Sequence, residues 1–397
     1  MSGFSAAGLD AIGAWLHDWV DSGRLPGALV LLARHGEVEL CETAGSSWVE
    51  AGRPFERSTI VRLHSMTKPV TALATLMLLD EGALALDDPV ARFVPSFASL
   101  TVNRRGTGDE LDPVPAETPM TVRHLLTHTS GLTYGEGNPG AVARLYEECR
   151  TDFGPDDGPL SEVVERLAAI PLLFEPGTAW GYGVSLDVVG RVVEVASGLP
   201  LDRFVEERIV GPLGLVDTGF AVPPEKLGRL AALYEATPDE LLALLESPAE
   251  SPYAGEVSTF SGGAGLVSTA EDFFRIAELL RRGGELDGVR LLREETVRLM
   301  TGDRLGRDLS ALGQPTFNET ATTGVGFGLG VSVVVDPART AWRSFAGEFA
   351  WGGYGSTAFW VDPVHDVTTV FLTQVIPSDR YPLRAELRSL VADALNE

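Results

Sequence analysis

The chain has 397 residues, of which 44% are hydrophobic and 22% are charged, so it is long enough for one large globular domain or two to three smaller ones. Its 56 acidic residues outnumber its 31 basic residues and give a formal net charge of −25 at pH 7. Because this charge repels phosphate backbones and anionic lipid surfaces, we expect neither a nucleic acid nor a membrane as a partner.

Residues 1–23 are predicted to form an amphipathic helix that belongs to the mature fold. This segment has no basic stretch followed by an uninterrupted apolar run, and it carries Asp10, His17 and Asp18, so it lacks the pattern of a secretory signal. No other stretch reaches the roughly 18 uncharged apolar residues that indicate a transmembrane helix. The two cysteines are too few for a disulfide framework. We therefore expect a cytoplasmic protein.

The first strands are predicted within residues 27–45. This segment contains two runs rich in valine and leucine, and the dipeptide His35-Gly36 between them indicates a hairpin turn. Residues 66–82 then carry apolar side chains at helical spacing and end with a glycine, which is typical of a helix. Ser65 thus stands where irregular chain changes to helix.

The pattern of the sequence changes between residues 91 and 255. Short helical patterns alternate here with connectors rich in proline and glycine, and convincing alternating strand patterns are absent. The helical patterns cover residues 122–132, 160–170, 186–198 and 238–247. The connectors 103–119 and 134–140 are long enough to line a surface or a cleft.

From about residue 260 the pattern of strands and amphipathic helices returns. A glycine-rich turn with a helix, three strand-like runs and a closing helix follow one another at residues 258–284, 327–336, 357–363, 367–375 and 383–396. A sheet built from both ends of the chain, with a helical insertion between them, is an α+β architecture with its cleft at the junction. We predict that residues 1–90 and 256–397 form an α/β sandwich domain and that residues 91–255 form a mostly helical domain.

Ser65 and Lys68 are the first candidate catalytic pair. The chain has only two lysines, so nearly all of its basic side chains are arginines. Three residues apart at the start of a helix, the two side chains lie on one face. A serine becomes a good nucleophile when a base takes its proton, and a buried lysine amine can serve as that base whereas an arginine cannot. Because Ser-x-x-Lys also arises by chance, the spacing alone leaves coincidence open.

Two further segments carry candidate site residues. Tyr182 lies in a glycine-framed loop just before a helical pattern, where its hydroxyl can act as a general base or acid, although a core tyrosine has the same pattern. Gly352, Gly353 and Gly355 stand beside an apolar strand and permit close approach to the backbone. Backbone N–H groups exposed at such a place can form an oxyanion hole, and a bulge or hairpin turn is the alternative.

Other kinds of site find little support in the sequence. His124 and His128 are four residues apart on one predicted helix, but no acidic residue lies between them and no third ligand is evident, so we expect no metal. The glycines of residues 262–265 are not followed by the Gly-Lys-Ser/Thr of a phosphate-binding loop, so we expect no nucleotide or other cofactor. A Gly-x-Ser-x-Gly motif is absent from the sequence.

Together and in this order, the segments resemble the serine β-lactamase and penicillin-binding protein superfamily, and within it the family VIII carboxylesterases and related acyltransferases. The resemblance covers nearly the whole chain. HSMTKPVTALATLMLLDEG (64–82) is similar to the Ser-x-x-Lys helix, YGVSLDVVGRVVE (182–194) to the tyrosine motif, and WGGYGSTAFWVDP (351–363) to the Trp-Gly-Gly segment. The implied fold is α+β and β-lactamase/transpeptidase-like, with an antiparallel sheet flanked by helices plus a mostly helical domain.

The resemblance also implies roles for individual residues. Ser65 is the nucleophile that becomes acylated, Lys68 accepts its proton, and Tyr182 is the general base and acid. The backbone N–H groups of Ser65 and Tyr354 form the oxyanion hole. The implied substrate pocket includes Trp351, Gly352, Gly353 and Val184.

Two departures from the superfamily bear on the substrate. Trp351 stands where β-lactamases use the lysine of Lys-Thr-Gly to hold a substrate carboxylate, and an indole has no charge for that purpose. Val184 stands where β-lactamases place an asparagine that binds the acyl amide. Both changes remove polar recognition of a β-lactam or peptide, so a neutral ester or thioester with a modest acyl group fits better.

We therefore expect a carboxylesterase, that is, a serine hydrolase that cleaves esters with short or medium acyl groups through an acyl-enzyme on Ser65. Its expected partner is a small-molecule ester, and the sequence does not indicate an oligomeric state. Three alternatives stay open: an acyltransferase that passes an acyl group to an alcohol or amine, a weak β-lactamase or D,D-peptidase, and a binding domain that has kept the cleft without catalysis.

Overall fold

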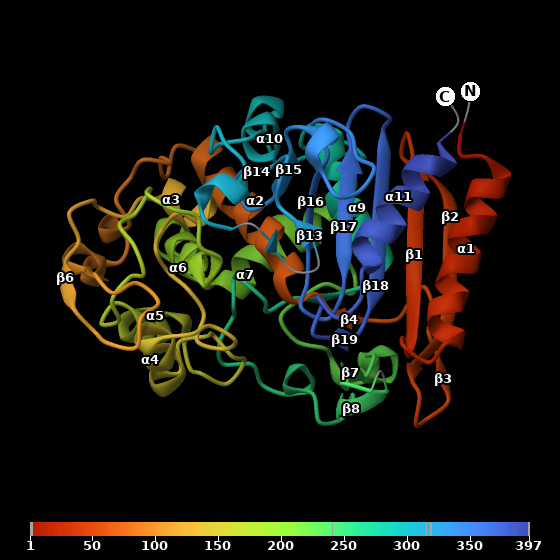
Figure 1. Ribbon diagram of the computed structural model, residues 1–397, viewed down its shortest axis with the longest axis horizontal. Helices are drawn as coiled ribbons and strands as arrows, with labels where there is room; N and C mark the ends of the chain where they lie inside the picture. The colour runs from red at the N-terminus through yellow and green to blue at the C-terminus, as the bar shows by residue number, and fades with distance from the viewer. Residues whose placement is uncertain (1–2, 240, 315, 318–319, 396–397) are drawn as a thin grey trace.

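A computed structural model describes the whole chain except residues 1–2, 240, 315, 318–319 and 396–397. Its centre is an eight-stranded sheet whose paired strands all run antiparallel (Figure 1). The strands lie in the order β14 (Val325–Phe327), β15 (Ser332–Val334), β16 (Phe349–Gly352), β17 (Ala358–Asp362), β18 (Val367–Thr373), β1 (Gly27–Arg34), β2 (Glu37–Trp48) and β3 (Arg53–Pro54). The sheet therefore joins both ends of the chain, as the sequence predicts.

Helices cover both faces of this sheet. On one face, α1 (Ala6–Asp21) and α11 (Leu383–Ala394) lie side by side close to the two ends of the chain (Figure 1). On the other face, α9 (Ala270–Arg281) packs Phe273 against Phe359 of β17, with ring centroids 5.0 Å apart. Because β1 is buried on both of its faces, its sequence is apolar almost throughout instead of alternating.

Helix α2 (Thr67–Asp80) lies between the sheet and the remaining helices. Residues 67–78 are all buried, and the helix contacts α6 (Ser185–Ser197), α7 (Leu201–Val205) and α10 (Glu294–Thr301). A helix that is buried on every side is surrounded by protein and belongs to the core. The start of α2, where Ser65 lies, is therefore held in place by the core.

Most of the other helices gather on the side of α2 away from the sheet (Figure 1). The helical patterns at 122–132, 160–170 and 186–198 are confirmed as α3 (Val122–Leu126), α5 (Leu160–Leu167) and α6. Helix α4 (Ala141–Cys149) and the short α8 (Gly211–Leu213) belong to the same region of the chain. The domain boundaries at residues 90 and 255 stay a prediction. Within the described residues, the helices are too short or too polar to cross a membrane.

The prediction of a helix over residues 238–247 is wrong. Strand β8 (Leu242–Glu246) pairs antiparallel with β7 (Leu233–Ala236), which pairs in parallel with β19 (Val375–Ile376). Leucine, alanine and glutamate favour helices, but the differences in propensity are small and hydrogen bonds to a neighbouring strand outweigh them. Residues 91–255 also contain β5 (Thr101–Asn103) and β6 (Pro113–Pro115), each too short to give an alternating pattern.

Candidate active site

Ser65 lies at the turn where strand β4 leads into helix α2. β4 (Val61–Arg62) pairs antiparallel with β9 (Val267–Ser268), and a 3-10 turn over His64–Met66 continues into α2. His64 has a φ of +46°, in the left-handed region that residues other than glycine seldom adopt. This conformation produces the sharp change of direction that sets Ser65 at the start of the helix.

The amine of Lys68 is the centre of the hydrogen-bond network around Ser65. The Lys68 side chain is 0% exposed, and its Nζ donates to Ser65 Oγ at 3.0 Å, to the Tyr134 hydroxyl at 2.9 Å and to the Gly263 carbonyl at 2.9 Å. These three contacts match the three N–H donors of an ammonium, and when the amine is neutral its lone pair can take the place of the donor to Ser65 Oγ. The structure thus brings Ser65 and Lys68 together, and it adds two partners that the spacing did not indicate.

Tyr134 and Tyr182 both lie against Lys68. The Lys68 Nζ is 4.7 Å from the centroid of the Tyr182 ring, and the rings of Tyr134 and Tyr182 meet edge to face at 5.6 Å. Burial, assisted by the hydrogen bond and electrostatic interaction with Tyr182, raises the pKa of Tyr134 well above its usual value. Tyr134 therefore stays a neutral phenol. The sequence offered one signal for it, a tyrosine in the glycine-rich connector 134–140, and the residue was missed because no spacing links it to Ser65.

A buried aromatic cluster supports the Tyr182 ring. Trp180 stacks on it with centroids 6.1 Å apart, Trp351 lies at 5.5 Å, and His128 at 4.9 Å. His128 is 0% exposed, and burial together with the positive charge of Lys68 holds its pKa well below the usual value. The cluster is therefore neutral, and it fixes the plane of the tyrosine ring beside Lys68.

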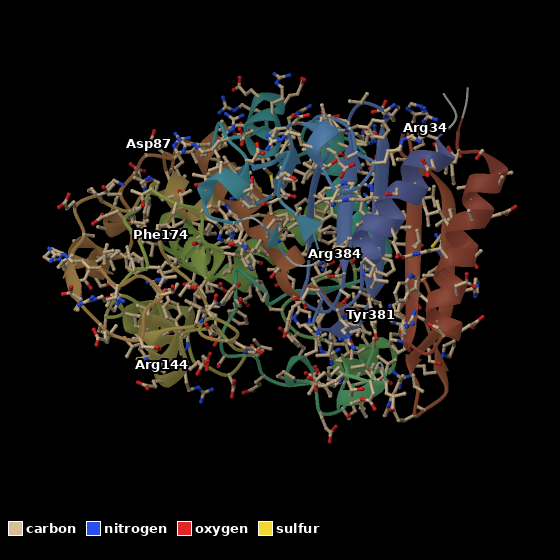
Figure 2. All side chains as sticks on the ribbon, viewed as in Figure 1. Arg34, Asp87, Arg144, Phe174, Tyr381 and Arg384 are labelled. Carbon is tan, nitrogen blue, oxygen red and sulfur yellow. The ribbon has the colours of Figure 1, made fainter. Side chains whose placement is uncertain are left out.

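The glycines after Trp351 form a tight turn close to Ser65. A Cβ on Gly353 would lie 2.2 Å from the carbonyl oxygen of Leu63, so only glycine fits there. The Gly353 carbonyl accepts a hydrogen bond from the Ser356 N–H at 3.1 Å and another from the Arg384 guanidinium at 2.8 Å. Arg384 is labelled in Figure 2. Because the carbonyl and the following N–H of a trans peptide point in opposite directions, the Tyr354 N–H points away from Arg384. Both interpretations of the glycines, close approach and a turn, describe this segment.

A cavity of about 450 Å³ opens at Ser65. It is lined by His64, Ser65, Tyr134, Glu136, Gly137, Asp152, Tyr182, Ala264, Tyr354, Pro377, Ser378 and Asp379. Three of these side chains are carboxylates, and no lysine or arginine is among them. Of the residues assigned to the oxyanion hole, Ser65 and Tyr354 both line the cavity. Trp351, Gly352, Gly353 and Val184 are not in this lining, and their role as pocket residues stays a prediction.

The histidine pair considered for a metal has other contacts. His124 Nδ1 accepts from the Thr121 N–H at 3.2 Å as part of a helix cap, whereas His128 is enclosed by the aromatic cluster. Across the described part of the chain, no group of three histidine, cysteine or acidic side chains is arranged to hold a metal ion.

Several known proteins resemble the chain over nearly its whole length. A family model described as "Beta-lactamase" matches residues 12–393. Esterase EstB of Burkholderia gladioli is 36% identical over 388 residues, which cover 93% of this chain and 90% of that protein. Lovastatin esterase of Penicillium rubens is 32% identical over 381 residues, with coverages of 91% and 92%. The solved structure of EstCE1, a hydrolase with promiscuous acyltransferase activity, superposes with a TM-score of 0.81 at 29% identity and covers 97% of this chain and 98% of that one.

The site makes a prediction about His64, whose ring is half-buried with its Nε2 shielded from solvent. Burial, together with the charges of Arg62 and Lys68, lowers the pKa of His64 to about 3. We expect its imidazole NMR signal, assigned from its loss in His64→Asn, to stay unchanged between about pH 8 and pH 5. A titration midpoint near the usual value of about 6.5 would contradict this.

The same shift has a defined effect on stability. The unfolded chain takes up a proton at His64 near pH 6.5 while the folded chain does not, so stability must fall as the pH drops from about 6.5 toward 3. This contribution of His64 is fully present above about pH 6.5. The difference in unfolding free energy between the wild type and His64→Asn, measured across that range, isolates it.

Proposed function

The chain belongs to the beta-lactamase family, and from this premise we propose that it is a serine hydrolase that cleaves neutral carboxylic esters with short or medium acyl groups through an acyl-enzyme on Ser65. One observation carries the proposal: the buried amine of Lys68 lies 3.0 Å from the Ser65 hydroxyl at the edge of a cavity of about 450 Å³. A base within hydrogen-bond reach of a serine, in a space that admits a small molecule, is what nucleophilic catalysis requires.

Acylation begins when Ser65 Oγ attacks the carbonyl carbon of the ester. Lys68 reacts as a neutral amine: the hydroxyl proton passes to the lone pair of Nζ along the 3.0 Å contact, and a tetrahedral intermediate forms. When the intermediate collapses, the bond between the carbonyl carbon and the alcohol oxygen breaks and the alcohol leaves with a proton. We assign the delivery of this proton to the Tyr182 hydroxyl, which regains a proton from the Lys68 ammonium. The centroid of the Tyr182 ring lies 4.7 Å from Lys68 Nζ, and the Tyr134 hydroxyl contacts the same amine at 2.9 Å.

The negative oxygen of the tetrahedral intermediate needs N–H donors. We assign this role to the backbone N–H groups of Ser65 and Tyr354, since both residues line the cavity. The hydrogen bond from Arg384 to the Gly353 carbonyl, at 2.8 Å, supports this assignment because it fixes the peptide that carries the Tyr354 N–H. A donor that is already oriented costs no reorganisation during the reaction.

Hydrolysis ends when water attacks the acyl-enzyme and releases the acid. An alcohol or amine that reaches the same carbonyl first takes the acyl group instead, so acyl transfer is the second candidate activity. The observation in its favour is the likeness to EstCE1, whose description combines both activities. Product analysis in the presence of an added alcohol separates the two.

Two features argue against a β-lactam or a D-Ala-D-Ala peptide as the preferred substrate. Trp351 is buried in the aromatic cluster at 6% exposure and offers no cation for a substrate carboxylate. The carboxylates of Glu136, Asp152 and Asp379 line the cavity and repel such a group. Weak turnover is therefore expected with these substrates.

Because the chain has only two lysines, substitutions at these two positions test directly whether Lys68 is the base. We expect Ser65→Ala and Lys68→Arg each to lower kcat/KM for p-nitrophenyl butyrate by about 100-fold or more, because the first removes the nucleophile and the second replaces the base with a permanent cation. The matched control is Lys226→Arg at the only other lysine, which pairs with Asp217 on the surface and should keep the wild-type rate.

Equal rates for the wild type and Ser65→Ala would contradict an acyl-enzyme on Ser65. An active Lys68→Arg variant would leave the nucleophile in place but remove Lys68 from the role of base.

The acidic cavity predicts selectivity by charge. Three acetyl thioesters of similar size test it: the neutral S-3,3-dimethylbutyl thioacetate, the cationic acetylthiocholine and the anionic 3-(acetylthio)propanoate. We expect kcat/KM for the anionic ester to be about tenfold or more below that of the neutral one at low salt, and the gap to narrow at about 0.5 M salt.

The charge-neutralising pair Glu136→Gln and Asp379→Asn should raise the rate with the anionic ester and leave the neutral one nearly unchanged. Asp10→Asn, at an exposed position of α1 on the far face of the sheet, is the matched control. Equal rates with the neutral and anionic esters in the wild type would show that the carboxylates do not govern selection.

A further inference from the structure

The glycine-rich segment 261–264, which no phosphate-binding pattern explains, is a turn between α2 and α6. It is joined to α2 through two carbonyls: Gly262 accepts from Thr71 Oγ1 at 2.7 Å, and Gly263 accepts from Lys68 Nζ at 2.9 Å. A Cβ on Gly262 would lie 2.5 Å from the carbonyl oxygen of Leu186 on α6, so the turn fits between the helices only without that side chain.

The other side of the turn contacts the buried carboxylate of Asp187. Asp187 Oδ1 accepts from Ser261 Oγ at 2.5 Å and from the Gly263 N–H at 2.9 Å. A Cβ on Gly263 would lie 2.3 Å from Asp187 Oδ2. Gly263 thus donates its N–H to the acid and accepts from Lys68 through its carbonyl, so a single residue links Asp187 to the amine beside Ser65.

Asp187 is unusual among the acidic residues because it is 1% exposed and forms no ion pair within 4 Å among the described residues. Burial raises its pKa to about 6, while the positive charge of Lys68 and the hydrogen bonds from Ser261 and Gly263 act in the opposite direction. A buried carboxylate with no partner cation is costly. The positive charge that acts on Asp187 is that of Lys68, and both side chains contact Gly263.

Polar and titratable side chains from several packed segments face Lys68 and Asp187. Around Lys68 they are Ser65, His64, His128, Tyr134 and Tyr182. Around Asp187 they are Ser261, Tyr134 and Tyr253, and burial also raises the pKa of Tyr253 to about 12. The two histidines have lowered pKa values and the two tyrosines beside Asp187 have raised ones, so these four are neutral near pH 7. The ionic interaction is therefore between Lys68 and Asp187.

We propose that Asp187 is a positioning residue that holds the Ser261–Ala264 turn against Lys68 and supplies the buried negative charge that balances the Lys68 ammonium formed when Ser65 is acylated. The inference rests on the proposed function of Ser65. In this step the Ser65 proton moves to Lys68, the bond from Oγ to the acyl carbon forms, and Asp187 keeps its charge without exchanging a proton. The carboxylate lowers the energy of the charged state that the proton transfer creates.

The test compares Asp187→Asn with Thr71→Val in the full-length protein. The asparagine keeps an oxygen acceptor for Ser261 and Gly263 but removes the charge. The valine removes the hydrogen bond from Thr71 of α2 to the same turn without changing any charge. The rate constant for labelling of Ser65 by a fluorophosphonate, followed by intact mass against pH, reports acylation alone, since the Oγ–P bond forms, fluoride leaves and the proton goes to Lys68.

In the profile of the labelling rate constant against pH, we expect Asp187→Asn to lower the plateau by about tenfold or more. We also expect the acid limb, where the rate falls as the pH drops, to move to lower pH by about one unit, because the Lys68 ammonium loses its buried counter-charge. Thr71→Val should leave the position of the limb unchanged. A limb that does not move in Asp187→Asn, or that moves equally in both variants, would overturn the proposal. Failure of the wild type to be labelled at Ser65 would instead contradict the proposed function.

A second measurement needs no change at Asp187, in case Asp187→Asn does not fold. Because the chain has only two lysines, the Lys226→Arg variant labelled with ¹³C-lysine gives the signal of Lys68 alone. We expect the Lys68 Cε resonance of the phosphonylated protein to have the shift of an ammonium across neutral pH. The shift of a neutral amine in that adduct would overturn the role of Asp187 as its counter-charge.

Discussion

The hydrogen bonding of one buried amine organises this site. Lys68 is 0% exposed, so its amine needs hydrogen-bond partners inside the protein, and these come from three separate segments of the chain: Ser65 at the start of α2, Tyr134 in a connector, and Gly263 in a glycine turn. Each of these segments is shaped for the contact. Helix α2 is buried on every side and is thereby fixed in the core, and the glycine turn lacks the side chain that would hold it away from α6. Ser65 is therefore oriented by the same contacts that satisfy the lysine.

Much of this arrangement follows from patterns of the sequence. The helix from 66 to 82, the hairpin at His35-Gly36 and the sheet built from both chain ends are confirmed, because each depends on local periodicity or on a turn signal that the core reinforces. The strand β8 was not predictable, since its leucines and glutamate favour a helix and only pairing with β7 makes it a strand. Tyr134 and Asp187 were not assigned to the site for a related reason. Tyr134 contacts Lys68 from 66 residues away in sequence, and Asp187, more than a hundred residues away, is linked to Lys68 through Gly263. No spacing rule predicts such contacts.

The charges around the cavity bear on the substrates that it admits. The Lys68 amine beside Ser65 is occupied by partners inside the protein, and the acidic and basic side chains that line the cavity are all carboxylates apart from His64. Trp351 packs in the aromatic cluster that holds Tyr182, so the position contributes to the orientation of the tyrosine. On the proposed function, such a site forms an acyl-enzyme and selects against anionic substrates. Esterases and acyltransferases share these means, since they differ in which acceptor reaches the acyl carbonyl.

The most direct test of the account is to find the acyl group itself. The full-length protein is mixed with a p-nitrophenyl ester, quenched in acid within the first turnover, and analysed by intact mass and by peptide mapping, with a thioester and a β-lactam in parallel. The account predicts an added mass equal to the acyl group on the peptide that contains Ser65, with the ester and thioester forming it faster than the β-lactam. An acyl group found on another residue, or turnover without any acylation of Ser65, would contradict it.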